Sequence, residues 1–392
     1  MSVLAMVSAV AGFVKVRYLL DKAVIDNLVF RTHYRVTTAI FFVSCILVTG
    51  NNLIGDPINC INDGSIPEHV INTFCWITYT FSIPGRVGSP VGSHVAHPGL
   101  GPYVKDDEII YHSYYQWVPF MLFFQGILFY VPHWIWKNWE EGKIRMVTDG
   151  VRGSVIGMKD ERKARQKRLV QYIVDTLHMH NAYALGYFFC EFLNFINVIL
   201  NMFIIDTFLG GTFMTYGLDV LEFANMNQEN RTDPMIEIFP RVTKCTFHKY
   251  GPTGTIQKHD SLCVLALNIL NEKIYIFLWF WLIFLAFLSA IAIVYSLAVL
   301  MLPSIREVIL KRRFRFGPPT GVSALISKTQ IGDFFLLHLL GQNMSMMCFG
   351  ELLDELSHKL HIENNIPTAP STMELSPMYT SDKLKLHKET EA

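Results

Sequence analysis

Residues 274–305 read IYIFLWFWLIFLAFLSAIAIVYSLAVLMLPSI and contain no Asp, Glu, Lys or Arg. A helix needs about 20 mostly apolar residues to cross the hydrocarbon core of a bilayer, so this stretch alone predicts a membrane-spanning helix. The whole chain of 392 residues is 51% hydrophobic and only 17% charged. An ordinary soluble enzyme of this size carries more charge, and the composition argues against that class.

Three further stretches have the same character. Residues 36–55 and 109–136 carry no charged side chain, and residues 176–205 carry a single one, Glu191. Each is long enough to span a bilayer. The sequence therefore predicts an all-α membrane protein whose subunit has four transmembrane helices.

The basic residues between these stretches indicate the orientation. Lys and Arg number five in the first 35 residues, ten in residues 137–175 and ten after the fourth span. Residues 56–108 have two against six acids, and residues 206–272 have five against eight acids. Excess Lys and Arg mark the cytoplasmic side. We expect a multi-pass membrane protein with both termini and the middle loop inside, and two long loops outside.

The N-terminal run MSVLAMVSAVAGFV is apolar, but no basic residues precede it, and Lys15 and Arg17 follow it instead. This order is not that of a signal peptide, and fourteen residues are too few to span a bilayer. We expect a short helix packed against or inside the protein.

Four cysteines lie in the two outer loops: Cys60 and Cys75 in the first, Cys245 and Cys263 in the second. An even number on the oxidising side indicates two disulfides. Four cysteines allow three pairings, and the residues alone do not choose among them.

A zinc site is the alternative use of the second pair, because Cys245, His248, His259 and Cys263 have a spacing close to that of zinc ligands. The first pair would then lack partners, so disulfides are favoured.

No P-loop, GxSxG or HExxH motif occurs, and we expect no enzyme activity, no catalytic residues, no metal and no cofactor. No basic domain is present to bind nucleic acid.

Several patterns inside the spans and loops leave alternatives open. Glu191, Asn194, Asn197 and Asn201 share one face of the third span and either pack against a neighbouring helix or line a pore. Pro132 predicts a kink in the second span. The glycine- and proline-rich outer loops predict turns and a surface that either recognises another molecule or merely caps the bundle.

Two inner segments have helical patterns. Residues 159–181 combine mixed charge with apolar residues at helical spacing and predict an amphipathic helix beneath the membrane, whose basic residues contact either water or anionic membrane lipid. Residues 331–343 predict a second inner helix.

The pentapeptide YYQWV, formed by Tyr114, Tyr115, Gln116, Trp117 and Val118, opens the second span. Its aromatic residues are typical of a membrane boundary. It also resembles the hallmark pentapeptide of the innexins, the invertebrate gap-junction proteins. Other segments resemble the same family: DNLVFRTHYRVTT (26–38), IGDPINC (54–60), NTFCWI (72–77), FPRVTKCTFHKYGPTG (239–254) and LNILNEKIYIFLWFWLI (267–283). The resemblance covers roughly residues 1–345 and is greatest to insect members.

The resemblance implies a gap-junction channel subunit. Subunits would form a ring of about eight, alone or with other innexins, around a wide pore for passive passage of ions and small molecules. Two such hemichannels in adjacent cells would dock through their outer loops. The N-terminal helix would line the pore mouth through Met1, Ser2, Val3, Leu4, Met6 and Val7. The family pattern also implies the pairs Cys60–Cys263 and Cys75–Cys245. The alternatives are an unpaired hemichannel that releases small molecules and a four-span adhesion or scaffold protein.

The expected organisation is a cytoplasmic N-terminal pore helix and linker (1–35), spans at 36–55, 111–136, 181–205 and 273–303, outer loops at 56–110 and 206–272, a cytoplasmic loop (137–180), a cytoplasmic helical region (304–362) and a disordered tail (363–392). Asn230 begins an N-glycosylation sequon in the second outer loop. A glycan there would obstruct docking and favour the unpaired hemichannel, unless the sequon is unused or lies on the flank of the ring.

Overall fold

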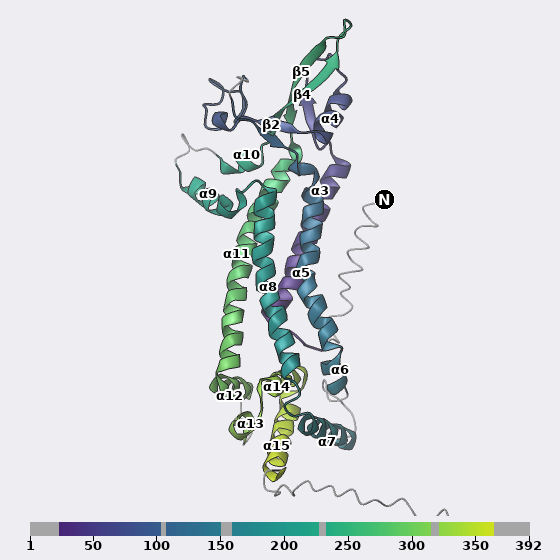
Figure 1. Cartoon of the computed structure of the whole chain (residues 1–392), viewed down its shortest axis with the longest axis vertical. Helices are drawn as coiled ribbons and strands as arrows, with labels where there is room; N and C mark the ends of the chain where they lie inside the picture. Colours follow the sequence, from purple (N-terminus) through teal and green to yellow (C-terminus); the bar gives the residue numbers. More distant parts are fainter. Residues whose placement is uncertain (1–22, 103–106, 150–158, 227–232, 315–320, 364–392) are drawn as a thin grey trace, which may run out of the picture.

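The computed structural model describes residues 23–102, 107–149, 159–226, 233–314 and 321–363, and the molecule is elongated (Figure 1). Four long helices run side by side along its length. A β-sheet lies at one end, here called the sheet end, and shorter helices gather at the other, here called the helical end. The predicted pore-mouth residues Met1 to Val7, the sequon at Asn230 and residues 364–392 of the predicted tail lie outside the described residues.

Within the described residues, four helices are long and apolar enough to cross a membrane, which confirms the predicted fold class. The first consists of α2 (Leu28–Arg31), η2 (Thr32–Thr37) and α3 (Thr38–Ile54). The others are α5 (Val118–Glu140), α8 (Asn181–Phe208) and α11 (Ala266–Met301). At about 1.5 Å per residue, α11 is longer than a hydrocarbon core about 30 Å thick, so it extends beyond the bilayer.

The first helix begins at Leu28, before the charge-free stretch that identified it. Asn27 caps it, because its side chain accepts a hydrogen bond from the Phe30 amide at 2.7 Å. Arg31 pairs with Asp26 at 2.6 Å, so its charge is compensated within the helix start. The charge-free stretch ends at Arg35, but the helix continues beyond it to Leu28.

The π-helical segment η2 orients two polar side chains, His33 and Thr37, toward α11. His33 bonds to Ser289 at 2.8 Å, and Thr37 accepts from the Trp281 indole at 3.0 Å. Side chains four residues apart share one helix face, so the π-helical segment alone positions both side chains for their contacts with α11.

The polar face of α8 packs inside the subunit. Glu191 accepts a hydrogen bond from Asn27 at 2.5 Å and another from Ser296 of α11. Asn194 and Asn201 are buried, and Asn197 donates to the Leu128 carbonyl of α5 at 3.2 Å. Of the two alternatives for this stripe, the structure supports helix packing over pore lining.

The sheet end contains a five-stranded antiparallel sheet in the order β1-β5-β4-β2-β3. The strands are β1 (Asn59–Ile61), β2 (Thr80–Ser82), β3 (Ile110–His112), β4 (Val242–Tyr250) and β5 (Ile256–Val264). Both outer loops contribute strands. This sheet was not predicted from the sequence, because three of its strands have only three residues and show no alternating pattern.

Short helices surround the sheet and connect it to the spans. They are α4 (Glu68–Ile77), η3 (Pro84–Arg86), η4 (Tyr114–Gln116), α9 (Phe213–Asn225) and α10 (Pro234–Ile238). In Figure 1, α9 and α10 lie to one side at the base of the sheet, and the β4–β5 hairpin projects farthest from the bundle.

The helical end consists of α6 (Lys143–Val147), α7 (Lys159–Asp175), α12 (Pro303–Arg312), α13 (Val322–Lys328), α14 (Ile331–Asn343) and α15 (Met346–Glu363). The apolar side of α7 joins the core of this end through Leu169, Val170 and Ile173. Its basic residues Lys163 and Lys167 are exposed. The predicted amphipathic helix therefore packs on other helices of the same chain.

The start of α14 is fixed against the start of α8. Asp333 accepts hydrogen bonds from the backbone amides of His178 at 3.0 Å and Gln330 at 3.1 Å. Burial raises the pKa of Asp333, but hydrogen bonds from the His180 side chain and these amides outweigh burial and lower it overall. The carboxylate is therefore charged and joins the turn before α8 to α14.

We predict that Gly332→Ala destabilises the helical end. A Cβ at Gly332 would lie 2.2 Å from the His180 carbonyl carbon and 2.4 Å from the Asn181 nitrogen. Both are backbone atoms of another segment, so the clash can be relieved only by moving helices apart, at a cost of about 3 kcal/mol. Thermal unfolding of the purified protein in detergent should show a lower midpoint.

Gly50→Ala is the matched control, because a Cβ added to this residue of α3 would have nothing within 4 Å. Alanine is the better helix former by about 1 kcal/mol, so this variant should unfold at the same or a higher temperature. Equal midpoints for the two variants would contradict the close approach of α14 to α8.

Candidate functional site

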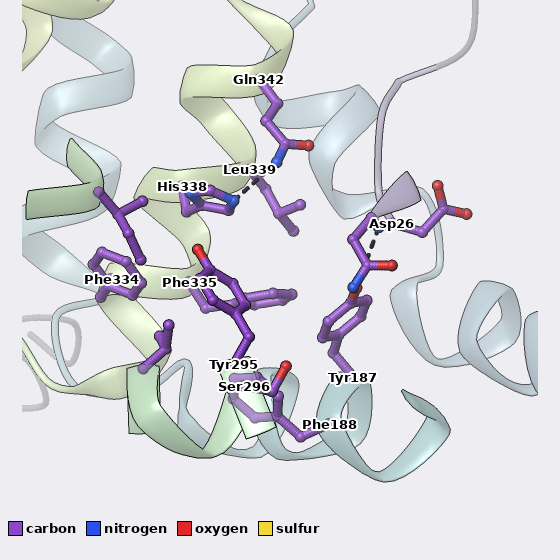
Figure 2. A pocket seen from close by; sticks show the side chains of 13 residues that line it. Asp26, Tyr187, Phe188, Tyr295, Ser296, Phe334, Phe335, His338, Leu339 and Gln342 are labelled. Atoms are coloured by element: carbon purple, nitrogen blue, oxygen red, sulfur yellow. Dashed lines mark hydrogen bonds between the residues drawn. The ribbon is translucent and has the colours of Figure 1, made fainter. Parts of the chain in front are cut away.

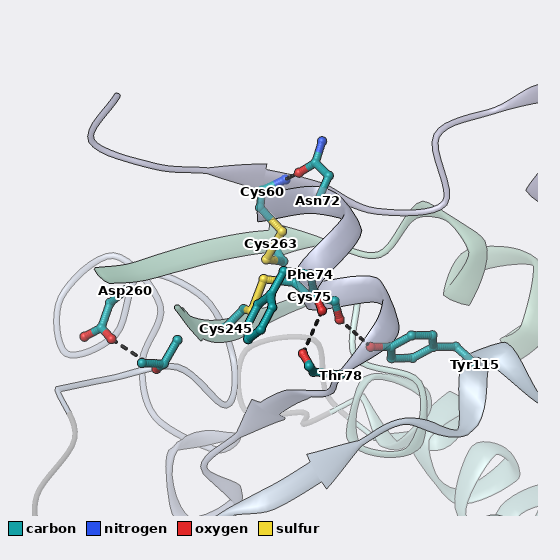
Figure 3. The surroundings of a disulfide bond; sticks show 10 residues. Cys60, Asn72, Phe74, Cys75, Thr78, Tyr115, Cys245, Asp260 and Cys263 are labelled. Atoms are coloured by element: carbon teal, nitrogen blue, oxygen red, sulfur yellow. Dashed lines mark hydrogen bonds between the residues drawn. A yellow bond between two sulfur atoms is a disulfide. The ribbon is translucent and has the colours of Figure 1, made fainter. Parts of the chain in front are cut away.

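Two disulfides join the first outer segment to the second at the sheet end (Figure 3). Cys60 of β1 is bonded to Cys263 of β5, and Cys75 of α4 is bonded to Cys245 of β4. This is the pairing that the family resemblance implies. All four cysteines are buried, so the bonds lie inside the sheet end and not on its surface.

The disulfides exclude the alternative zinc site. Cys245 and Cys263 are bonded to other cysteines and have no thiolate to offer a metal. The sulfur atoms of Cys60, Cys75 and Cys263 lie within 4.8 Å of one another, which is explained by the two neighbouring disulfides.

The YYQWV pentapeptide completes the end of α4, the helix that carries Cys75. The last carbonyls of a helix have no partner within it. Here the Tyr115 hydroxyl donates to the Cys75 carbonyl at 3.0 Å, and the Gln116 amide donates to the carbonyls of Trp76 and Ile77. Thr78 satisfies the carbonyl before these, that of Phe74, at 2.7 Å. The pentapeptide thus fixes the cysteine-bearing helix onto the start of α5.

The remaining residues of the pentapeptide have different positions. Tyr114 packs edge-on against Phe239, with ring centroids 5.7 Å apart, and Val118 is fully buried. The side chain of Trp117 is 61% exposed, which agrees with a membrane-boundary residue. Burial raises the pKa of Tyr115 to about 12, so its hydroxyl stays protonated and remains a donor.

An ion pair with a buried carboxylate fixes the sheet to α11. The Glu272 side chain is 1% exposed and accepts from Arg241 at 3.0 and 3.1 Å, while Lys273 lies 3.2 Å from the same carboxylate. Asn268 also donates to the Pro240 carbonyl at 2.8 Å. Because Arg241 directly precedes β4, these bonds set the position of the hairpin relative to the bundle. The pair was not predicted from the sequence, because Glu272 and Lys273 only marked the end of a charge-free stretch there.

The hairpin formed by β4 and β5 presents its tip to solvent. Tyr250 and Ile256 face each other in the register next to the turn and are 76% and 67% exposed. Two large apolar side chains at the tip of a braced hairpin are suited to contact with another protein surface.

The segment before the first span is held at the helical end by several elements. The Asn343 side chain of α14 accepts from the Val24 amide at 2.6 Å and donates to the Val24 carbonyl at 2.8 Å. The Trp136 indole of α5 donates to the Ile25 carbonyl at 3.0 Å, and the Tyr187 hydroxyl of α8 accepts from the Asn27 amide at 3.2 Å. Residues 24–27, here called the linker, are therefore fixed to three helices. No sequence pattern indicated Asn343.

Pro132 lies buried inside α5, whose helix continues on both sides of it. Its predicted kink stays a prediction.

The family model for innexins matches residues 26–360 of this chain. The chain belongs to the innexin family. It is 61% identical over 376 residues to innexin inx3 of Drosophila melanogaster, covering 96% of this chain and 95% of that relative. Innexin inx2 of Schistocerca americana is 48% identical over 352 residues, with 90% and 98% covered. Innexin shaking-B of Drosophila melanogaster is 42% identical over 337 residues, with 86% and 90% covered.

Membership in this family gives the function. Innexins are gap-junction channel subunits, and this innexin is one. The family is a channel family and not an enzyme family. The four membrane-spanning candidates and the disulfide-braced sheet end agree with this function, and the structure now shows how the two parts are joined.

We predict that Tyr115→Phe weakens the sheet end. The change removes one hydroxyl and leaves the buried Cys75 carbonyl without its donor, at a cost of about 1–3 kcal/mol. Purified protein in detergent should unfold at a lower temperature. Tyr79→Phe is the control, since Tyr79 is 51% exposed, and it should leave the midpoint within error. Equal effects of both changes would refute the role of the Tyr115 hydroxyl.

Proposed function

We propose that the sheet end of this innexin faces outward and docks with a hemichannel of the adjacent cell. The observation that carries the proposal is the position of both disulfides at that end. Disulfides persist outside the cell and are rare in the reducing cytosol. The opposite, helical end carries the exposed basic residues of α7, which favour the cytoplasmic side.

Both termini then lie in the cytoplasm. The described chain begins beside α14 at the helical end and ends there with α15. Both ends of the described chain therefore lie on the same side of the membrane. A plasma-membrane subunit that spans the bilayer four times meets this requirement.

We further infer that eight subunits form a ring, as the family resemblance implies, either alone or with other innexins. The N-terminal residues, including Met1 and Met6, would line the pore mouth. The fixed linker supports this role, because it gives the segment before Val24 a constant starting point beside the helices.

The hairpin tip is our candidate for the docking contact. It projects farthest from the bundle, and its exposed Tyr250 and Ile256 are carried on strands that two disulfides brace (Figures 1 and 3). Bracing keeps the tip ordered before contact, which lowers the entropic cost of docking.

The two helices that flank the sequon at Asn230 in sequence lie away from this tip. The sequon is flanked by α9, which ends at Asn225, and by α10, which begins at Pro234. Both helices lie at the base of the sheet, away from the tip. The flanking helices leave the tip clear, and we propose paired hemichannels as the main function.

Orientation can be tested with a membrane-impermeant lysine reagent on intact cells. Lys258 on β5 has a side chain 54% exposed and should be labelled, whereas Lys163 and Lys167 on α7 should be protected until the cells are permeabilised. Peptide mapping by mass spectrometry locates the label. Labelling of the α7 lysines in intact cells, with Lys258 protected, would reverse the proposed orientation.

Docking can be tested with Cys75→Ser, which breaks the bond to Cys245 and frees α4 from β4. We expect dye transfer between paired cells to be abolished while the subunit still reaches the membrane, because the spans are untouched. Cys45→Ser is the matched control: Cys45 forms no disulfide and donates to the Pro119 carbonyl, a bond that a serine hydroxyl retains. Normal dye transfer by Cys75→Ser would remove the support for a braced docking surface.

A further inference from the structure

The helix α12 at the end of α11 has one face that none of the structural roles above uses. Its residues Ser304, Ile305, Val308, Ile309 and Arg312 follow a helical spacing. Together with Arg313 at the end of the helix and Tyr295 of α11, they line an open groove of about 540 Å³. This volume lies within the range of about 300–1,000 Å³ that is typical of ligand sites. The groove is apolar along its length and basic at one end.

The groove adjoins a smaller cavity of about 60 Å³ that lies between α8, α11 and α14 (Figure 2). Tyr295 and Ile309 line both spaces. The cavity walls are mostly apolar and include Phe188, Phe335 and Leu339. A ligand that occupies both spaces therefore needs an apolar chain at one end and a polar group at the other.

Several polar side chains of the cavity already bond within the protein. His338 bonds to Gln342 at 2.8 Å, Ser296 bonds to Glu191, and Asp26 pairs with Arg31. Burial, and secondarily the charge of Arg313, lower the pKa of His338 to about 4, so its imidazole is neutral at physiological pH. The cavity therefore presents a mainly apolar surface to an entering acyl chain.

The two arginines of the groove differ from the other cations of α12. Arg306 donates to the carbonyls of Val299 and Leu300, and Lys311 pairs with Glu307. Arg312 is exposed, and no carboxylate among the described residues pairs with it or with Arg313. Arg313 lies over the Phe349 ring, 5.8 Å from its centroid, and burial lowers its pKa. An incompletely solvated guanidinium without a carboxylate is suited to a phosphate group.

The position of α12 decides where such a ligand comes from. It directly follows a membrane-spanning helix, and the exposed Met301 and Leu302 mark the turn between them. An apolar helix face with basic residues at its end is typical of the boundary between headgroups and acyl chains. The apolar face also continues into the cavity beside α11, because Tyr295 and Ile309 line both spaces.

We propose that this groove binds an anionic membrane phospholipid. Its phosphate lies at Arg312 and Arg313, its glycerol region lies along Val308 and Ile309, and the end of one acyl chain enters the cavity beside Tyr295. The site requires only that the bundle spans a bilayer, so its failure and a failure of docking can be told apart. In the orientation proposed above it takes lipid from the cytoplasmic leaflet, where anionic lipids are concentrated.

The site also adjoins the linker, because Asp26 and Asn27 line the cavity together with α14 residues. A bound acyl chain would pack between the linker and α11. The bound lipid would therefore stabilise the position of the linker, which directly follows the N-terminal segment.

The test uses the full-length protein in nanodiscs of phosphatidylcholine that contain a minor fraction of phosphatidylserine. After detergent extraction and purification, mass spectrometry measures which lipids stay bound. We expect phosphatidylserine to be enriched on the wild-type protein. Arg312→Gln with Arg313→Gln should weaken its binding about 30-fold, equivalent to about 2 kcal/mol or about 1 kcal/mol for each arginine.

Two further variants make the result specific. Arg165→Gln with Arg168→Gln removes two exposed arginines from α7, equal in charge but outside the groove, and should leave retention unchanged. Val308→Asp alters the apolar part of the groove at a side chain 58% exposed, where folding is least affected, and should also lower retention. The elution volume on size exclusion confirms assembly for each variant.

Several results would overturn the proposal. They are unchanged retention in the Arg312/Arg313 variant, equal loss in the α7 control, unchanged retention in Val308→Asp, and equal retention of phosphatidylcholine and phosphatidylserine. Soluble glycerophosphoserine serves as the competitor for the headgroup alone. If it displaces the lipid at similar concentrations, the site binds a free phosphate group and not a phospholipid.

Discussion

The two disulfides are the constraint on which the sheet end depends. Cys60 and Cys75 follow the first span, whereas Cys245 and Cys263 precede the fourth, so the bonds join opposite halves of the chain. The strands β1, β2 and β3 are too short to be stable alone. β1 pairs with the nine-residue strand β5 and β2 with the nine-residue strand β4, so the sheet needs both halves of the chain in place. The covalent links supply this proximity, and the projection of the hairpin follows from it.

At the helical end, hydrogen bonds and not disulfides hold distant segments of the chain together. Asp333 joins the turn before α8 to α14, and Asn343 at the other end of α14 holds Val24 of the linker through a donor and an acceptor. The helix α14 therefore connects two segments that lie far apart in sequence. The cavity that adjoins the proposed lipid groove is lined by His338 and Leu339 of the same helix, so an acyl chain there would act on elements that already position the linker.

The sequence predicted those parts of the fold that the bilayer dictates. Three charge-free stretches and one with the single charge of Glu191 are visible without any structure, because hydrocarbon excludes charge. Residues 331–343 were identified as a helix with the bounds of α14. The sheet was not predicted, because a strand such as Asn59–Ile61 exists only through its partner on β5. The polar face of α8 was visible by periodicity, but periodicity identifies a face and not its neighbour. Only the contacts of Glu191 with Asn27 and Ser296 showed that it packs inside the subunit.

The YYQWV pentapeptide shows how one short motif serves both the membrane and the sheet end. As a boundary marker it would need only aromatic residues, and Trp117 alone is exposed enough for that role. Tyr115 and Gln116 instead satisfy carbonyls that the last turn of α4 cannot satisfy itself. Cys75 lies in that turn, so the geometry of a disulfide depends on residues that open a membrane-spanning helix. A displacement of α5 would therefore be transmitted to α4 and β4 directly, which makes the pentapeptide a second mechanical connection between the bundle and the sheet, beside the Arg241–Glu272 pair on α11.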